Sequence, residues 1–155
     1  MLFRPLFLAA TLIAIAAPLA ARESLGVYES WAAFKDPSPL RCYAIAKAQG
    51  KPAAPAYATV SNWPDKGVRG AVHIVLSREV GAKSAIRLVV GGKRFELVAK
   101  GRNAWAADVR QDAAIVAAMR SASRMSVSGG GFTDRYSLAG AATAIDAATV
   151  GCAKR

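Results

Sequence analysis

The sequence predicts a mainly β, single-domain fold: an antiparallel β-sandwich or a partly closed barrel, with two short helices in the C-terminal half. Short stretches that alternate apolar and polar residues recur along the chain, and turn-forming Gly, Pro and Asp residues separate them. Segments with helical periodicity come only late in the chain. Because the first half has no helices to connect parallel strands, these patterns argue against a parallel α/β fold.

Alternation predicts four strands in the first half of the chain, and turn chemistry separates them. The strands are expected over residues 25–34, 41–47, 56–63 and 71–78. Turns or loops are expected at residues 36–39, 49–55 and 64–67, each of which contains Pro.

The strongest local pattern is a β-hairpin over residues 84–99, where two alternating runs flank Gly91-Gly92. Counting outward from this turn pairs Val89 with Arg94, Leu88 with Phe95, Arg87 with Glu96 and Ile86 with Leu97. This register places four large apolar side chains on one buried face and opposes Arg87 to Glu96 on the other, as a cross-strand charge pair. A one-residue slip would lose both features.

The rest of the chain combines strands with two helices. A strand is expected over residues 103–109, and the period then changes to that of a helix over 111–122, with Asp112 near its start. Two further strands, over residues 124–128 and 132–136, flank a turn at residues 129–131. Ser137 is predicted to cap a small-residue helix over 138–148.

Residues 1–21 have the layout of a secretory signal peptide. A basic start with Arg4 precedes an apolar run that ends in small residues at Ala21. We expect cleavage there, which leaves one domain over residues 22–155 in the periplasm or secreted. An uncleaved membrane anchor is the alternative, although the run is short for a bilayer core of about 30 Å. No later segment is long and apolar enough to span.

The chain is strongly basic, with a formal net charge of +11 that falls to +10 if Arg4 is removed with the signal peptide. The basic residues are scattered, which predicts a broad positive field. Outside the cytoplasm, anionic envelope lipid, acidic glycan and acidic protein are the expected partners, with Lys93 and Arg94 as possible contacts to an anionic surface. Simple solubility is the alternative explanation. Without a basic–aromatic repeat or a reader motif, nucleic acid is not expected.

The chain has two cysteines, Cys42 and Cys152, and one histidine. In an exported protein, two cysteines are expected to form one disulfide, although free thiols or an intermolecular bridge are the alternatives. The predicted bridge would tie the first third of the domain to its last residues. No C-x-x-C pair is present, and one histidine cannot complete a zinc site, so no metal or cofactor is predicted.

No residue is predicted to be catalytic. His73 could act as a general base, but the chain has no G-x-S-x-G motif, and alternation places this histidine on a partly exposed strand face. The carboxylates form no compact motif; Asp108 and Asp112 are interpreted as helix-start residues. The glycines at 91–92 and 129–131 are interpreted as hairpin turns rather than phosphate loops.

The aromatic residues allow one more binding hypothesis. Trp31, Trp63 and Trp105, together with the tyrosines, could form a platform on which sugars stack. Packing in the core and on sheet faces is the commoner role of such side chains, and it is the interpretation favoured here.

Several features together resemble a known family. They are the exported start, Trp31 followed by Cys42, a basic domain, and Tyr136-Ser137-Leu138-Ala139-Gly140 leading into a small-residue helix. The chain resembles the invasion-associated locus B family of exported bacterial envelope proteins. The resemblance implies a β-rich periplasmic or surface-associated protein without known enzymatic activity, in a family linked in some pathogens to entry into host cells.

We therefore expect a non-catalytic envelope protein that acts through protein, glycan or lipid contacts. A small periplasmic hydrolase or glycan-modifying enzyme is the alternative.

Overall fold

The structure is a computed structural model that describes residues 21–153. The strands are β1 (Glu23–Tyr28), β2 (Trp31–Pro37), β3 (Leu40–Lys47), β4 (Tyr57–Trp63), β5 (Val68–Val80), β6 (Ile86–Val90), β7 (Lys93–Trp105), β8 (Arg124–Gly129) and β9 (Phe132–Ser137). The helices are α1 (Val109–Ser121), α2 (Ala141–Gly151) and the short 3-10 helix η1 (Pro64–Lys66). The predicted signal peptide, residues 1–21, lies outside the described residues except for Ala21.

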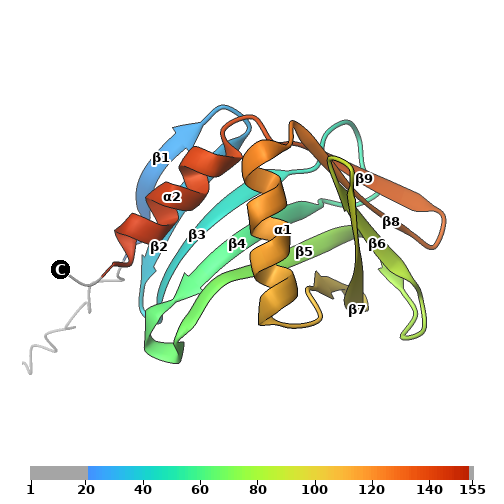
Figure 1. The fold of residues 1–155 in the computed structure, drawn as a ribbon, viewed down its shortest axis with the longest axis horizontal. Coiled ribbons are helices and arrows are strands. Elements are labelled where there is room, and N and C mark those ends of the chain that lie inside the picture. The colour runs from blue at the N-terminus through green and yellow to red at the C-terminus, as the bar shows by residue number, and fades with distance from the viewer. Residues whose placement is uncertain (1–20, 154–155) are drawn as a thin grey trace, which may run out of the picture.

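Within the described residues the strands form one antiparallel sheet, in the order β1-β2-β3-β4-β5-β7-β6-β8-β9 (Figure 1). The sheet has two free edges, β1 and β9, and is not closed into a barrel. The prediction of a mainly β, antiparallel fold with two helices in the C-terminal half is confirmed.

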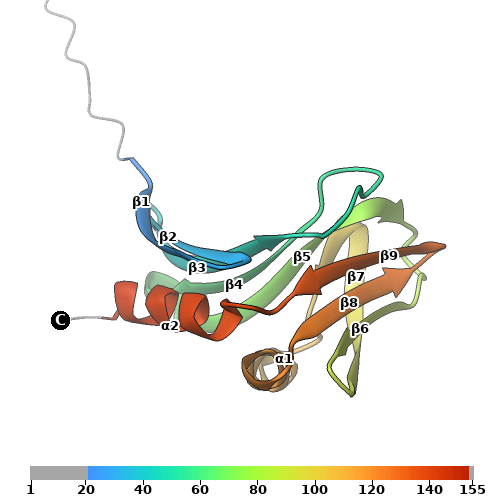
Figure 2. The ribbon, with the colours of Figure 1, turned by 90° about the horizontal axis from the view of Figure 1, so that it is seen from above.

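The long strand β7 bends the sheet. Its first half pairs with β6 and its second half pairs with β5. At the change of partner the register shifts between Val75 and Val80 of β5, opposite Gly101, whose φ is +60°. Glycine adopts this left-handed conformation without strain, and such an irregularity increases the local twist. Figure 2 shows the result: β6 and β8 come round to the side of the sheet on which the helices lie.

The core fills the space between the bent sheet and the helices. Helix α2 packs across β1, β2 and β3, whereas α1 packs against β5 and touches α2 (Figures 1 and 2). Small residues on α2 let its backbone approach the strands closely. The largest fully buried side chains include Trp31, Tyr136, Ile74, Leu76, Ile86, Leu88, Ile115 and Met119.

The predicted hairpin register is confirmed, because Arg87 pairs with Glu96 and Leu88 with Phe95. Leu88 is buried and Phe95 packs against the core, as the alternation required. The expected charge pair does not form an ion pair: within the described residues the ion pairs are Arg22–Asp36 and Arg120–Asp146. Arg87 and Glu96 are both exposed, and hydrated charges gain little from pairing at a surface.

Two strand predictions were wrong. Residues 25–34 do not form one strand but the β1–β2 hairpin, which turns at Glu29 and Ser30, with Glu29 at a φ of +52°. This turn lacks Gly, Pro, Asn and Asp, and Ser30 is its one turn-favouring residue, so its sequence carries only a weak turn signal. Residues 103–105 do not begin a new strand; they continue β7 beyond the irregularity at Gly101.

The second helix begins later than predicted. Helix α2 starts at Ala141, and its N-cap residue is Gly140, not Ser137. Ser137 instead ends β9, and its Oγ accepts a 3.2 Å hydrogen bond from the amide of Ala139. The Ser side chain therefore shapes the turn that leads into the helix rather than capping the helix itself.

Candidate functional site

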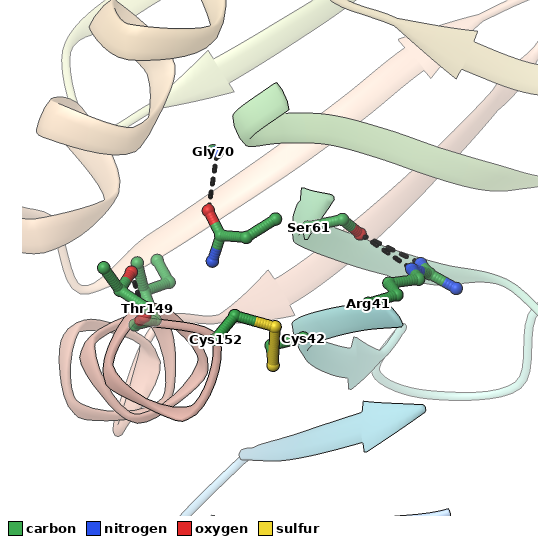
Figure 3. The surroundings of a disulfide bond; sticks show 8 residues. Arg41, Cys42, Ser61, Gly70, Thr149 and Cys152 are labelled. Atoms are coloured by element: carbon green, nitrogen blue, oxygen red, sulfur yellow. Dashed lines mark hydrogen bonds between the residues drawn. A yellow bond between two sulfur atoms is a disulfide. The ribbon is translucent and has the colours of Figure 1, made fainter. Parts of the chain in front are cut away.

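The two cysteines form the predicted disulfide. Cys42 lies fully buried in β3, Cys152 follows the last turn of α2, and their Cα atoms are 5.8 Å apart (Figure 3). A pocket of about 460 Å³ lies beside the bridge, between Asn62, Arg69 and Thr149. Asn62 Oδ1 accepts a hydrogen bond from the amide of Gly70, and the Thr149 hydroxyl donates one to the Ile145 carbonyl. Because these polar groups are already engaged in hydrogen bonds within the fold, this pocket is a weak candidate for ligand binding.

His73 lies on the outer face of β5, opposite the helices, as alternation predicted. Its imidazole stacks on Trp105, with ring centroids 5.5 Å apart, and its Nε2 lies 2.9 Å from Oδ1 of Asn103. This pairing joins the imidazole to an amide rather than to a carboxylate or a hydroxyl. The arrangement orients the ring, but it does not supply the carboxylate that a catalytic triad places beside its histidine.

The acidic side chains serve the fold. Asp108 caps α1 by accepting a hydrogen bond from the amide of Gln111, which confirms its interpretation as a helix-start residue. Asp112 accepts one from the amide of Val72 and so attaches α1 to β5; burial raises the pKa of this carboxyl. Among the described residues, no three His, Cys, Asp or Glu side chains gather closely enough to hold a metal ion.

The three tryptophans lie in three different environments. Trp31 is buried and donates a 2.9 Å hydrogen bond from Nε1 to the Ser137 carbonyl. Trp63 lies at the end of β4, and Trp105 lies 40% exposed at the end of β7, with β5 between these strands. The hypothesis of one platform built from all three is therefore wrong.

The bent half of the sheet instead presents a basic outer surface, which we call the distal face. Along β6 to β9, residues that point inward are buried or packed on the core, and those between them point outward. The outward basic residues are Arg87, Arg94, Lys100, Arg124 and Arg135, all exposed. Among the described residues of these four strands, Glu96 is the one carboxylate that points outward with them.

Strand pairing brings the distal face together. Arg94 pairs with Val89, Val89 with Ser126, and Ser126 with Arg135, so one row crosses four neighbouring strands. At about 4.8 Å per strand, its two arginines are about 14 Å apart. Outward hydroxyls from β8 and β9 lie between and beside the basic groups, at Ser126, Ser128, Thr133 and Ser137.

The structure separates the two predicted contact residues at the hairpin. Arg94 belongs to the distal face. Lys93 pairs with the buried Val90, so its side chain leaves the strand on the opposite side. Both side chains are exposed at the hairpin tip. The hairpin register already groups Arg87 with Arg94, but Arg124 and Arg135 come from later strands, and only a knowledge of the strand order could have placed them beside this pair.

Among the described residues, no helix has the length and apolarity needed to cross a bilayer. No protein-family model matches the sequence, and no curated protein or solved structure is significantly similar to it. Function is therefore inferred from the surfaces of this chain itself.

Proposed function

We propose that this chain is an exported, non-catalytic protein of the bacterial envelope that binds anionic envelope surfaces through the distal face. The observation that carries the proposal is the excess of positive charge on that face. The resemblance to the invasion-associated locus B family supports the same class of function.

The disulfide supports the exported location, because bridges of this kind persist in oxidising compartments and are rare in the cytosol. Removal of residues 1–21 would make Arg22 the first residue of the mature protein. Intact-mass analysis of the protein from a periplasmic extract tests this step. A mature N-terminus at or within a few residues of Arg22 is expected, and a full-length product embedded in the membrane would contradict it.

The distal face suits an array of anionic groups rather than one small ligand. Its basic side chains stand on four neighbouring strands, so several can approach charged groups of the same surface at once. The intervening hydroxyls can donate further hydrogen bonds to phosphate or carboxylate oxygens. Such binding is electrostatic and is screened over about 8 Å at physiological salt.

Vesicle co-sedimentation tests the proposal. The mature protein should bind vesicles of phosphatidylglycerol mixed with phosphatidylcholine more strongly than vesicles of phosphatidylcholine alone, and the binding should weaken steeply as salt rises. Soluble polygalacturonate in the same assay, added as a competitor, distinguishes a preference for acidic glycan from one for lipid. The absence of binding to either anionic partner at low salt would overturn the proposal, as would binding that salt does not affect.

Paired variants locate the surface. Replacing Arg87 and Arg135 with Gln should weaken vesicle binding about 30-fold, because each basic residue near an anionic membrane contributes about 1 kcal/mol. The control replaces Arg69 and Arg110, exposed residues that lie outside the distal face, with Gln and removes the same charge. Reversing the charges of Lys93 and Arg94 should weaken binding only in part. Equal losses in the first variant and the control would show that net charge, not the distal face, governs binding.

A further inference from the structure

A second basic site lies on the other half of the sheet. An open groove of about 450 Å³ runs beside the β2–β3 turn; its lining residues are Arg22, Asp36, Pro37, Ser38, Pro39, Arg41 and Trp63. Arg41 alternates along β3 with Cys42, which faces α2, so the groove opens on the face of the sheet away from the helices (Figure 3). It is separate from the distal face.

Arg41 is held firmly in this groove. Its Nε and Nη2 donate to the hydroxyl of Ser61, at 3.3 and 2.9 Å. Its guanidinium carbon lies 4.1 Å from the ring centroid of Tyr43 and 5.0 Å from that of Trp63. Stacking on two aromatic rings and two hydrogen bonds fix the plane of the guanidinium, yet they engage neither hydrogen of Nη1.

The carboxylate opposite Arg41 in the strand register, that of Asp36, already forms an ion pair with Arg22. Asp36 pairs with Arg41 across β2 and β3, but its Oδ1 accepts a 2.8 Å hydrogen bond from Arg22. That bond further raises the pKa of Arg22, whose guanidinium also lies over the rings of Phe34 and Tyr43. Among the described residues, no carboxylate forms an ion pair with Arg41.

The local balance of charge therefore favours an anion. Two guanidinium groups and one carboxylate line the groove, and Lys66 adds a cation 4.7 Å from the ring centroid of Trp63. Because no carboxylate among the described residues forms an ion pair with Arg41, its charge is available to a bound anion. The planar fork of Arg matches two oxygens of a carboxylate or phosphate group.

We propose that this groove binds an oxyanion, the carboxylate or phosphate group of an acidic sugar, on the Nη edge of Arg41, with Trp63 forming the apolar wall beside the sugar. The site is independent of the proposed function of the distal face. Its volume lies within the range of about 300–1,000 Å³ typical of small-molecule sites.

Titration with three sugars, followed by NMR of the mature protein at constant ionic strength, tests the site. Glucuronate and glucose 6-phosphate should bind, and glucose should bind at least tenfold more weakly. The tryptophan indole N–H signals report the location, because Trp63 borders the groove, whereas Trp31 is buried and Trp105 lies at the end of β7. The Trp63 signal, assigned with Trp63→Phe, should move most. The preferred anion then identifies the group as carboxylate or phosphate.

Two substitutions of Arg41 separate charge from geometry. Arg41→Gln should weaken binding of the preferred anion at least tenfold, and Arg41→Lys, which keeps the charge but loses the fork, should weaken it about three- to tenfold. Arg135→Gln on the distal face removes the same charge elsewhere and should leave binding unchanged. If a variant fails to fold, the shift of the Trp63 signal in the unmodified protein decides the question.

Three outcomes would overturn the proposal. They are equal binding of glucose and the anions, equal losses in Arg41→Gln and Arg135→Gln, and anion binding that leaves the Trp63 signal in place. Failure here leaves the vesicle-binding proposal intact, because that proposal depends on different residues.

Discussion

The backbone amide of Ser77 donates a 2.8 Å hydrogen bond to Oδ2 of Asp134, and both residues are buried. The bond joins β5 to β9, which are not neighbours in the sheet. It therefore holds the bent half of the sheet against the first half, and it depends on a carboxylate that alternation along β9 points into the interior.

Replacing Asp134 with Ala should destabilise the protein by about 2–3 kcal/mol, because the substitution leaves the buried Ser77 amide without an acceptor. Asp134→Asn keeps an acceptor oxygen and should cost less. Urea denaturation of both variants measures the difference. If Ala and Asn cost the same, the hydrogen bond does not account for the role of Asp134.

The disulfide should contribute much of the stability. Its cysteines are 110 residues apart, and closing a loop of this length restricts the unfolded chain by about 4–5 kcal/mol. The Cys42→Ala, Cys152→Ala double variant should lose about that much in urea denaturation, and the reduced unmodified protein should behave similarly. Recovery of two alkylatable thiols from freshly isolated protein would contradict the bridge itself.

Gly140 should tolerate no side chain. Its φ is +83°, and a Cβ there would overlap the carbonyl oxygen of Tyr28, which is backbone and cannot move aside easily. Gly140→Ala should cost about 3 kcal/mol or more. Gly131 is the matched control: its φ is +81°, but a Cβ would meet nothing within 4 Å.

Gly131→Ala should therefore cost only about 1–2 kcal/mol, the penalty for the left-handed conformation. Thermal and urea denaturation of the two variants separate the conformational penalty from the overlap. Similar losses in both would show that the overlap with Tyr28 is relieved by a small backbone shift.

Asp112 should make stability depend on pH. Burial raises its pKa above the ordinary 3.8, and the hydrogen bond from the Val72 amide opposes this only in part. The folded state then binds the proton more tightly than the unfolded state does. The contribution of Asp112 to stability is therefore greatest at low pH, and it is lost as the pH rises from 3.8 through the raised pKa.

Asp112→Asn keeps an oxygen that can accept from Val72 but carries no charge. The free energy of unfolding of this variant, relative to that of the unmodified protein, should be higher at pH 7 than at pH 3. Chemical denaturation of the variant and of the unmodified protein at the two pH values measures the change. A shift of the opposite sign would mean that the hydrogen bond outweighs burial.

Local patterns identified much of the fold. The register about Gly91-Gly92 follows from a tight turn and period-2 alternation, and both act between residues close in sequence. The same alternation placed His73 on the outer face. The Cys42–Cys152 bridge was predictable because the chain has no third cysteine.

Other features depended on contacts that no local pattern describes. The turn at Glu29 has Ser30 as its one turn-favouring residue, and β7 continues through Gly101 because it gains a second partner strand there. The N-terminus of α2 is set by Gly140, which packs against Tyr28, over a hundred positions away in the chain.

The sequence by itself therefore determined the class of fold, the hairpin register, the disulfide and the basic character of the protein. Only the tertiary structure decided which charges from distant segments share a surface. Arg135 joins Arg87 and Arg94 on the distal face because β8 lies between β6 and β9, and Arg41 is left without a carboxylate because Arg22 engages Asp36. Composition records the total charge, whereas its distribution depends on strand pairing between distant segments, which is stabilised by burial of the whole core.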